Sequence, residues 1–203
     1  YNETDGRPIL ATPTIGTVGL IKSMDKLILI KANTTDCLYL IGENPGHLGQ
    51  SALLKEILGI SGKEAGPAPE INFAKEIETA KLINELNAES NIVGGNDISD
   101  GGLMLAAAEI CMRNNLGIKI EASGSDIPWL FGEDQGLYLI VCAERNQINL
   151  QETSKRLRVH CQKLGVFGGD LIEIGRDQIS LSELKKLHET GLDHYFSTSI
   201  LNT

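Results

Sequence analysis

The sequence predicts an α+β fold in which helices cover a mixed β-sheet. Apolar runs of strand length and segments with helical spacing follow one another without strict strand–helix–strand alternation, which argues against a doubly wound parallel sheet. The 203 residues suffice for one core, and 41% hydrophobic with 22% charged residues is typical of a globular protein. No apolar stretch approaches the roughly 20 residues that a membrane-spanning helix needs.

Six short segments rich in Leu, Ile or Val are predicted as strands. Pro8 and Pro13 keep the chain before the first of them extended rather than helical. The last segment is a continuous apolar run, which is typical of a strand in the interior of a sheet. The pair Gly168-Gly169 breaks a further, final pair of strands. The six segments are residues 15–21, 27–31, 37–41, 92–93, 117–121 and 137–142.

Helices are predicted in the intervening segments. Residues 51–58 form a short amphipathic helix that ends at Gly59. Residues 71–89 carry apolar side chains at spacings of three and four from Phe73 to Leu86, and we expect their glutamates to form the solvated side.

Three further helices are expected nearer the C-terminus. Residues 103–113 are rich in small side chains, which favours close packing against a sheet, and residues 150–164 also have a helical pattern. Ser180, followed three residues later by Glu183, has the spacing of a capping box at the start of a helix over 181–189.

Charge and cysteine usage restrict the partners. The formal net charge is −9, and no basic stripe exists to neutralise phosphates, so we expect no nucleic-acid partner. The four cysteines are far apart, with no Cys-x-x-Cys pair and no His at zinc-ligand spacing. We therefore expect free thiols in a reducing compartment such as the cytoplasm. The cysteines are Cys37, Cys111, Cys142 and Cys161.

The most informative segment places two carboxylates and a hydroxyl, those of Asp97, Asp100 and Ser99, at a turn between a strand and a helix. Gly101 and Gly102 follow and let the backbone approach a ligand closely. Acidic residues at a helix N-terminus indicate either capping or a cation that bridges to phosphate. From these residues alone, a nucleotide site and a capped tight turn both remain open.

Two other segments could take part in a site. Glu133, Asp134 and Gln135 precede a buried strand, where they form either a polar cluster at a cleft or a solvated turn. The loop Gly46-His47-Leu48-Gly49-Gln50 lacks the Lys-Ser/Thr ending of a P-loop, which favours a packing loop with a structural His47.

Four landmarks in this order resemble the C-terminal part of the phosphoribosylformylglycinamidine synthase family, the large synthetase subunit. Each motif alone is weak, whereas their order and spacing are specific, and the resemblance covers essentially the whole chain. The landmarks are Tyr1–Thr4 with Pro13–Ile21, Gly46–Ser51, Asn96–Leu103 and Leu130–Gln135.

The resemblance implies a domain organisation. Family members consist of two halves that each resemble aminoimidazole ribonucleotide synthetase, and this chain is similar to the C-terminal domain of the second half. Residues 1–22 would then be a remnant of the preceding domain and a linker, and residues 23–203 the α+β domain. The absence of an initiator Met also leads us to expect a piece of a longer polypeptide.

The resemblance also implies an activity for the parent enzyme, an ATP-dependent ligase of purine biosynthesis. With Mg²⁺, ATP and ammonia from glutamine, such an enzyme converts formylglycinamide ribonucleotide to the amidine, releasing ADP and phosphate. Its partners would be the rest of the chain, a glutaminase subunit and a small accessory subunit. Since the family's catalytic His lies outside the matching region, we expect no catalytic residue here and no activity of the chain alone.

The resemblance assigns nucleotide binding to the turn from Asp97 to Gly102, with Asp100 as a metal ligand. Two positions depart from the family pattern: Asn96 stands where His is frequent, and Leu137 where Arg is common. An Arg could hold a phosphate with two hydrogen bonds, whereas Leu cannot. Two alternatives therefore stay open: a purely architectural, partner-docking domain, and another synthetase of the same superfamily.

Overall fold

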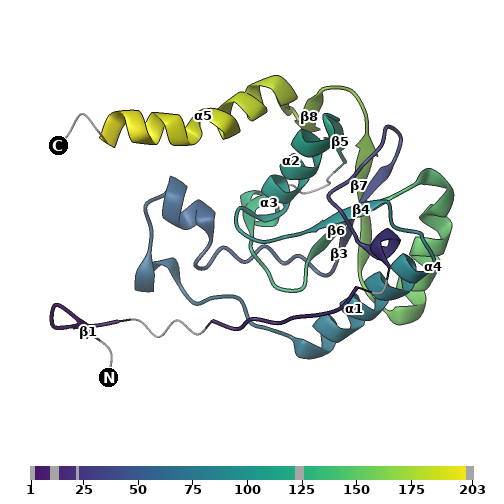
Figure 1. Ribbon diagram of the computed structural model, residues 1–203, viewed down its shortest axis with the longest axis horizontal. Helices are drawn as coiled ribbons and strands as arrows, with labels where there is room; N and C mark the ends of the chain where they lie inside the picture. The colour runs from purple at the N-terminus through teal and green to yellow at the C-terminus, as the bar shows by residue number, and fades with distance from the viewer. Residues whose placement is uncertain (1–2, 10–13, 22, 122–125, 200–203) are drawn as a thin grey trace.

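The computed structural model describes residues 3–9, 14–21, 23–121 and 126–199. A seven-stranded sheet with strand order β4-β6-β3-β7-β5-β8-β9 organises it (Figure 1). Only the pair β5 and β8 is parallel, so the sheet is mixed, as the sequence predicts. The strands are β3 (Cys37–Ile41), β4 (Gly94–Asp97), β5 (Ile118–Ile120), β6 (Tyr138–Cys142), β7 (Cys161–Phe167), β8 (Leu171–Ile174) and β9 (Asp177–Ser180), and a separate hairpin joins β1 (Glu3–Thr4) to β2 (Arg7–Pro8).

Helices lie on both faces of the sheet. The pair α1 and α4 covers one face and the pair α2 and α3 the other, while α5 extends away from the body (Figure 1). The helices are α1 (Phe73–Ala88), α2 (Gly102–Asn114), α3 (Ile127–Phe131), α4 (Gln147–Leu157) and α5 (Leu181–Ser199). Short helical turns are η1 (Met24–Lys26), η2 (Leu53–Ile57), η3 (Gly62–Ala65) and η4 (Glu144–Asn146).

Two hydrophobic cores result from this layering. Side chains alternate between the faces of a strand, so Leu38 and Leu40 of β3 pack on the α2 side, whereas Tyr39 and Ile41 pack on the α1 and α4 side. All five residues of β3 are buried, because both faces of this strand are covered.

The N-terminal strand predictions are wrong. Residues 15–21 form no strand and are exposed. Residues 27–31 form none either, although Leu29 O accepts a hydrogen bond from Gly95 N at 2.9 Å, so this segment lies along the edge of β4. That edge strand begins at Gly94 rather than at residue 92. A Cβ on Gly94 would stand 2.1 Å from Lys31 O. Gly94 and its neighbour Gly95 therefore let residues 27–31 approach the sheet closely.

The predicted helix over 150–164 is also wrong in its second half. The helix α4 ends at Leu157, Arg158 adopts a left-handed conformation with φ 58°, and β7 begins at Cys161. The short helix expected over 51–58 is present as η2, a π-helical turn.

The long helix α1 has the predicted extent, yet its buried face differs from the expected one. Thr79, Leu82 and Leu86 are buried, whereas Phe73 and Ile77 are 73% and 55% exposed. Two of its glutamates, Glu76 and Glu85, are half-buried rather than fully solvated, and Glu85 forms an ion pair with Arg156.

Other predictions of helices and strands are confirmed. The helix over 103–113 is α2, the strands over 37–41, 117–121 and 137–142 are β3, β5 and β6, and α5 has its predicted cap, since Ser180 Oγ accepts a hydrogen bond from Glu183 N at 3.2 Å. All four cysteines are free thiols. Within the described ranges, no helix has the length and apolar character to cross a membrane.

Candidate functional site

The turn that leads from β4 into α2 depends on its two glycines. Gly101 and Gly102 have φ of +85° and +69°, a region that favours glycine. A Cβ on Gly102 would stand 2.7 Å from the backbone of Phe131 in α3, so close packing also requires a glycine. Gly102 N donates to Ser99 O at 3.0 Å, and Ser99 Oγ donates to the Asp97 carboxylate.

The capping that the sequence allowed for at this turn does not occur. Gly101 itself occupies the N-cap position of α2, and neither Ser99 nor Asp100 caps the helix. Asp97, Ser99 and Asp100 are instead exposed, with their polar groups outside the helix.

Glu133 and Asp134 hold distant loops in place. Glu133 Oε1 accepts hydrogen bonds from Ala52 N at 2.7 Å and from Gly101 N at 2.8 Å. Asp134 Oδ2 accepts from Gly46 N at 3.0 Å and from His47 N at 2.8 Å, and Asp134 is only 8% exposed. The neighbouring pair therefore connects the glycine loop to the turn of α2, and it is not a solvated turn.

The two sequence motifs meet at one pocket with a cavity volume of about 410 Å³. Asp97, Ser99 and Asp100 line it from one side, and Glu133, Asp134 and Gln135 from the other. Gly101 and Gly102 are not among its lining residues. The other described residues around it are Gly49, Gln50, Pro69, Glu76, Ile98, Gly136, Leu137 and Tyr138.

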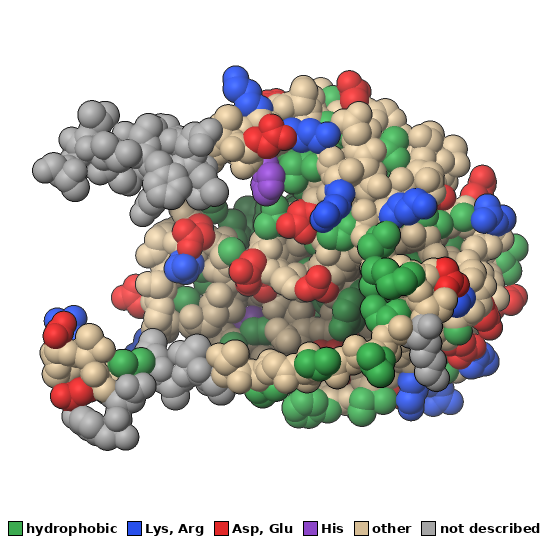
Figure 2. Space-filling view, viewed as in Figure 1, with side chains coloured by type: hydrophobic (Ala, Val, Ile, Leu, Met, Phe, Trp, Pro, Cys, Tyr) green, Lys and Arg blue, Asp and Glu red, His purple; other side chains and the backbone are tan. Residues whose placement is uncertain are grey.

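This pocket, called the acidic pocket below, carries strong negative charge. Five carboxylates line it, and no Lys or Arg does so among its described residues. Figure 2 shows acidic side chains around the hollow on one face of the molecule. Burial first, and then the charges of Glu76 and Asp97, raise the pKa of Tyr138. This negative charge opposes the entry of an anion unless a cation offsets it.

The acidic pocket has the oxygen donors that Mg²⁺ prefers, but no complete cage. In the described part of the chain, no three or more His, Cys, Asp or Glu side chains are grouped so as to hold a metal ion. Mg²⁺ is commonly bound by one or two carboxylates together with water and substrate phosphates, and Asp97 and Asp100 fit that partial role.

Leu137 lies at the floor of the acidic pocket and belongs to the core. Its side chain is 2% exposed and packs in the cluster that includes Leu103 and Leu139. It therefore places an apolar group at a position where an Arg could hold a phosphate with two hydrogen bonds.

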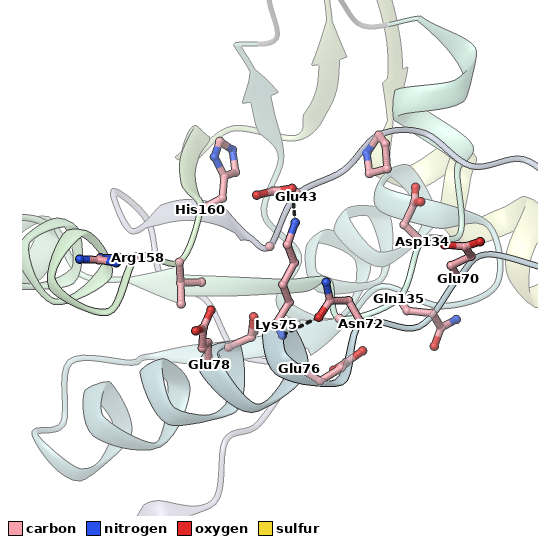
Figure 3. Close-up of a pocket in the computed structure, with 15 residues that line it drawn as sticks. Glu43, Glu70, Asn72, Lys75, Glu76, Glu78, Asp134, Gln135, Arg158 and His160 are labelled. Carbon is pink, nitrogen blue, oxygen red and sulfur yellow. Dashed lines mark hydrogen bonds and ion pairs between the residues drawn. The ribbon is translucent and has the colours of Figure 1, made fainter.

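A smaller pocket of about 190 Å³ adjoins the first (Figure 3). Lys75, at the start of α1, forms an ion pair with Glu43, and this hydrogen bond and charge, with a further contribution from His160, lower the pKa of Glu43. Glu76 and Asp134 line both pockets. The sequence does not indicate that Glu76 lines these pockets, because its position in α1 predicts only the solvated side of a helix.

The mixed sheet, its two covering layers and the pocket at the end of β4 define a class of protein. Residues 34–175 match the model of the family described as AIR synthase related protein, C-terminal domain, and the chain belongs to this family. The predicted fold class, similar to the C-terminal domain of aminoimidazole ribonucleotide synthetase, is thereby confirmed.

Individual relatives are PurL proteins. The chain is 41% identical over 191 residues to the phosphoribosylformylglycinamidine synthase subunit PurL of Ruegeria sp., covering 94% of this chain and 26% of that protein. Thermotoga maritima PurL complexed with ATP has a TM-score of 0.61 at 15% identity, covering 79% of this chain and 27% of that one.

The same Thermotoga protein complexed with FGAR has a TM-score of 0.63 at 16% identity. The match covers 78% of this chain and 29% of that one. At these identities the two structures show the fold alone. The chain spans about a quarter of the length of the curated relative that it matches.

Proposed function

We propose that the chain is the C-terminal-domain part of an ATP-dependent ligase that converts formylglycinamide ribonucleotide to its amidine with nitrogen from glutamine. The observation that carries the proposal is the 41% identity to a phosphoribosylformylglycinamidine synthase subunit over 94% of this chain. The relatives of known structure that bind ATP and FGAR share the fold. The parent protein would work in the cytoplasm, with a glutaminase subunit and a small accessory subunit as partners.

Within such an enzyme, the acidic pocket would face a nucleotide held through Mg²⁺. Asp100 and Asp97 would offer carboxylate oxygens to the ion, and Ser99 would orient Asp97 through the hydrogen bond between them. Bound Mg²⁺ would neutralise phosphate charge. Glu133, Asp134 and Gln135 would form the opposite wall. No residue of this chain is assigned to bond making, so the chain alone is expected to be inactive.

A second candidate function is architectural: the domain would pack against other parts of the enzyme and bind no ligand. Two observations favour it. The amides of Gly101 and Gly102 are already hydrogen-bonded within the chain, and Leu137 places no charge at the pocket floor. Asp100→Ala separates the candidates, because it removes Mg²⁺-dependent ADP binding only if the acidic pocket holds the nucleotide.

We also propose that residues 1–22 belong to a neighbouring domain, as the resemblance implies. The described residues 14–21 include Ile15, Val18 and Leu20, whose side chains are almost fully exposed. In contrast, Lys26 Nζ donates to Asn87 O and Ala88 O at the end of α1, so the chain is anchored from that point onward. The exposed apolar side chains would be buried in the neighbouring domain.

The activity is tested by recombination. A Ruegeria PurL subunit lacking the region that matches this chain is mixed with this chain, and ATP hydrolysis dependent on FGAR and ammonia is measured. Its own missing region serves as the positive control. Activity that appears only in the mixture supports the ligase assignment. Association without activity, where the control mixture is active, contradicts it and leaves the architectural candidate.

A further inference from the structure

Glu133 uses one oxygen to bind two main-chain amides from different parts of the chain. Glu133 Oε1 accepts from Ala52 N, 81 residues away, at 2.7 Å and from Gly101 N, 32 residues away, at 2.8 Å. Hydrogen bonds of this length to an ionised carboxylate are strong. The oxygen therefore sits where two backbone donors converge.

Converging backbone amides beside the first turn of a helix are what a phosphate oxygen uses when it binds a protein. In this chain the side chain of Glu133 already supplies the anionic oxygen. The next amide, that of Gly102, donates to Ser99 O at 3.0 Å. Both amides at the glycine turn are therefore used inside the chain, and the carboxylates of the acidic pocket face any ligand instead.

The backbone around Glu133 keeps this side chain in place. Glu133 N donates to His47 O at 2.9 Å, and the adjacent Asp134 binds the amides of Gly46 and His47. These three contacts fix both residues to the same loop. A ligand that displaced the carboxylate of Glu133 would leave the amides of Ala52 and Gly101 to be satisfied by the ligand alone.

We propose that Glu133 is a specificity-determining residue of the acidic pocket, where its carboxylate takes the place of an anionic ligand at the amides of Ala52 and Gly101. The pocket accordingly does not bind phosphate groups in the absence of a divalent cation. This inference rests on the proposed function only in taking a nucleotide phosphate as the intended ligand. It concerns selection between free and metal-bound phosphates, and it assigns Glu133 no part in the reaction.

The test uses ¹⁵N-labelled chain of all 203 residues and inorganic phosphate, without divalent cations, as the probe. Amide shifts of Ala52 and Gly101 are followed by NMR during the titration. In the unmodified chain both are expected to stay unchanged. In Glu133→Ala, both are expected to shift saturably, with half-saturation at a phosphate concentration at least about tenfold below the highest one that leaves the unmodified chain unchanged.

Two further variants separate the explanations. Glu133→Gln keeps a carbonyl oxygen that can accept from both amides, so it is expected to exclude phosphate as the unmodified chain does. Glu121→Gln removes one charge from an exposed residue that does not line the pocket, and it is expected to change nothing.

Phosphate-dependent shifts of Gly101 in the unmodified chain overturn the proposal, and this result needs no variant to fold. Equal phosphate binding by Glu133→Gln and Glu133→Ala also overturns it, since charge rather than occupancy would then exclude the anion. A folded Glu133→Ala variant that binds no phosphate overturns it as well. Failure of the ligase assignment shows instead as a recombination mixture without activity, which leaves the phosphate titration of this chain interpretable.

Discussion

Replacing Asp134 with alanine is expected to destabilise the chain by about 2–4 kcal/mol. The carboxylate is 8% exposed and accepts two backbone hydrogen bonds, from Gly46 N and His47 N, at 3.0 and 2.8 Å. Each buried amide left without a partner costs roughly 1–3 kcal/mol, and partial access of water to the loop keeps the sum below the maximum. Urea unfolding followed by circular dichroism measures the change.

Two controls distinguish this explanation from a general effect of mutation near the pocket. Asp134→Asn keeps an acceptor oxygen and should lose less than half as much stability as Asp134→Ala. Gln135→Ala changes the exposed neighbour and should stay within about 0.5 kcal/mol of the unmodified chain. If the stability of Asp134→Ala also stays within about 0.5 kcal/mol of the unmodified chain, the loop amides are hydrogen-bonded to water instead, and Asp134 does not hold the loop.

Three further changes test other parts of the structure. Gly102→Ala should lose about 2–4 kcal/mol of stability in the same urea assay, because a positive φ and a Cβ 2.7 Å from the backbone of Phe131 both oppose a side chain; an unchanged midpoint would contradict this packing. Leu82→Ala should lose about 2–5 kcal/mol through a cavity beneath α1, whereas exposed Phe73→Ala should lose little; equal losses would mean that the buried face is misassigned. Burial raises the pKa of Tyr39 from 10.0 to about 12. Unfolded Tyr39 therefore loses its proton first, and stability should fall as the pH rises from 10 towards 12, a fall that Tyr39→Phe should reduce.

Where local sequence determines structure, the sequence predictions hold. The cap of α5 needs only Ser180 and Glu183, and the apolar run over 137–142 forms β6 as expected. The end of α4 depends instead on Arg158, which adopts a left-handed conformation. A glycine at this position would have indicated the end of the helix in the sequence, and none is present. The segment after it has apolar residues that suit a helix or a strand, and pairing with β3 and β5 decides in favour of β7.

The sequence indicated two separate polar segments as candidate site residues, but it did not indicate that they line one pocket. Glu133 lies more than 30 residues after Asp97 and Asp100 in the sequence, and the pairing of β4 with β6, together with the hydrogen bond from Gly101 N to Glu133, brings the two loops together. The dual role of Glu133 depends on distances to Ala52 and Gly101, which no spacing rule reports. Long-range contacts of this kind explain why the sequence left a cleft and a solvated turn equally open.

The exposed segment 14–21 is a second case in which long-range contacts, rather than local sequence, decide the structure. Ile15, Val18 and Leu20 have the β-branched and aliphatic character of a strand, yet the described chain contains no strand that pairs with them. Strand propensity reflects packing against a neighbour, so a segment of this composition forms a strand only where a sheet edge and an apolar surface are supplied. The uncharged run from Thr14 to Ile21 therefore agrees with the proposal that this segment packs against a neighbouring domain, and the curated relative is about four times as long as this chain.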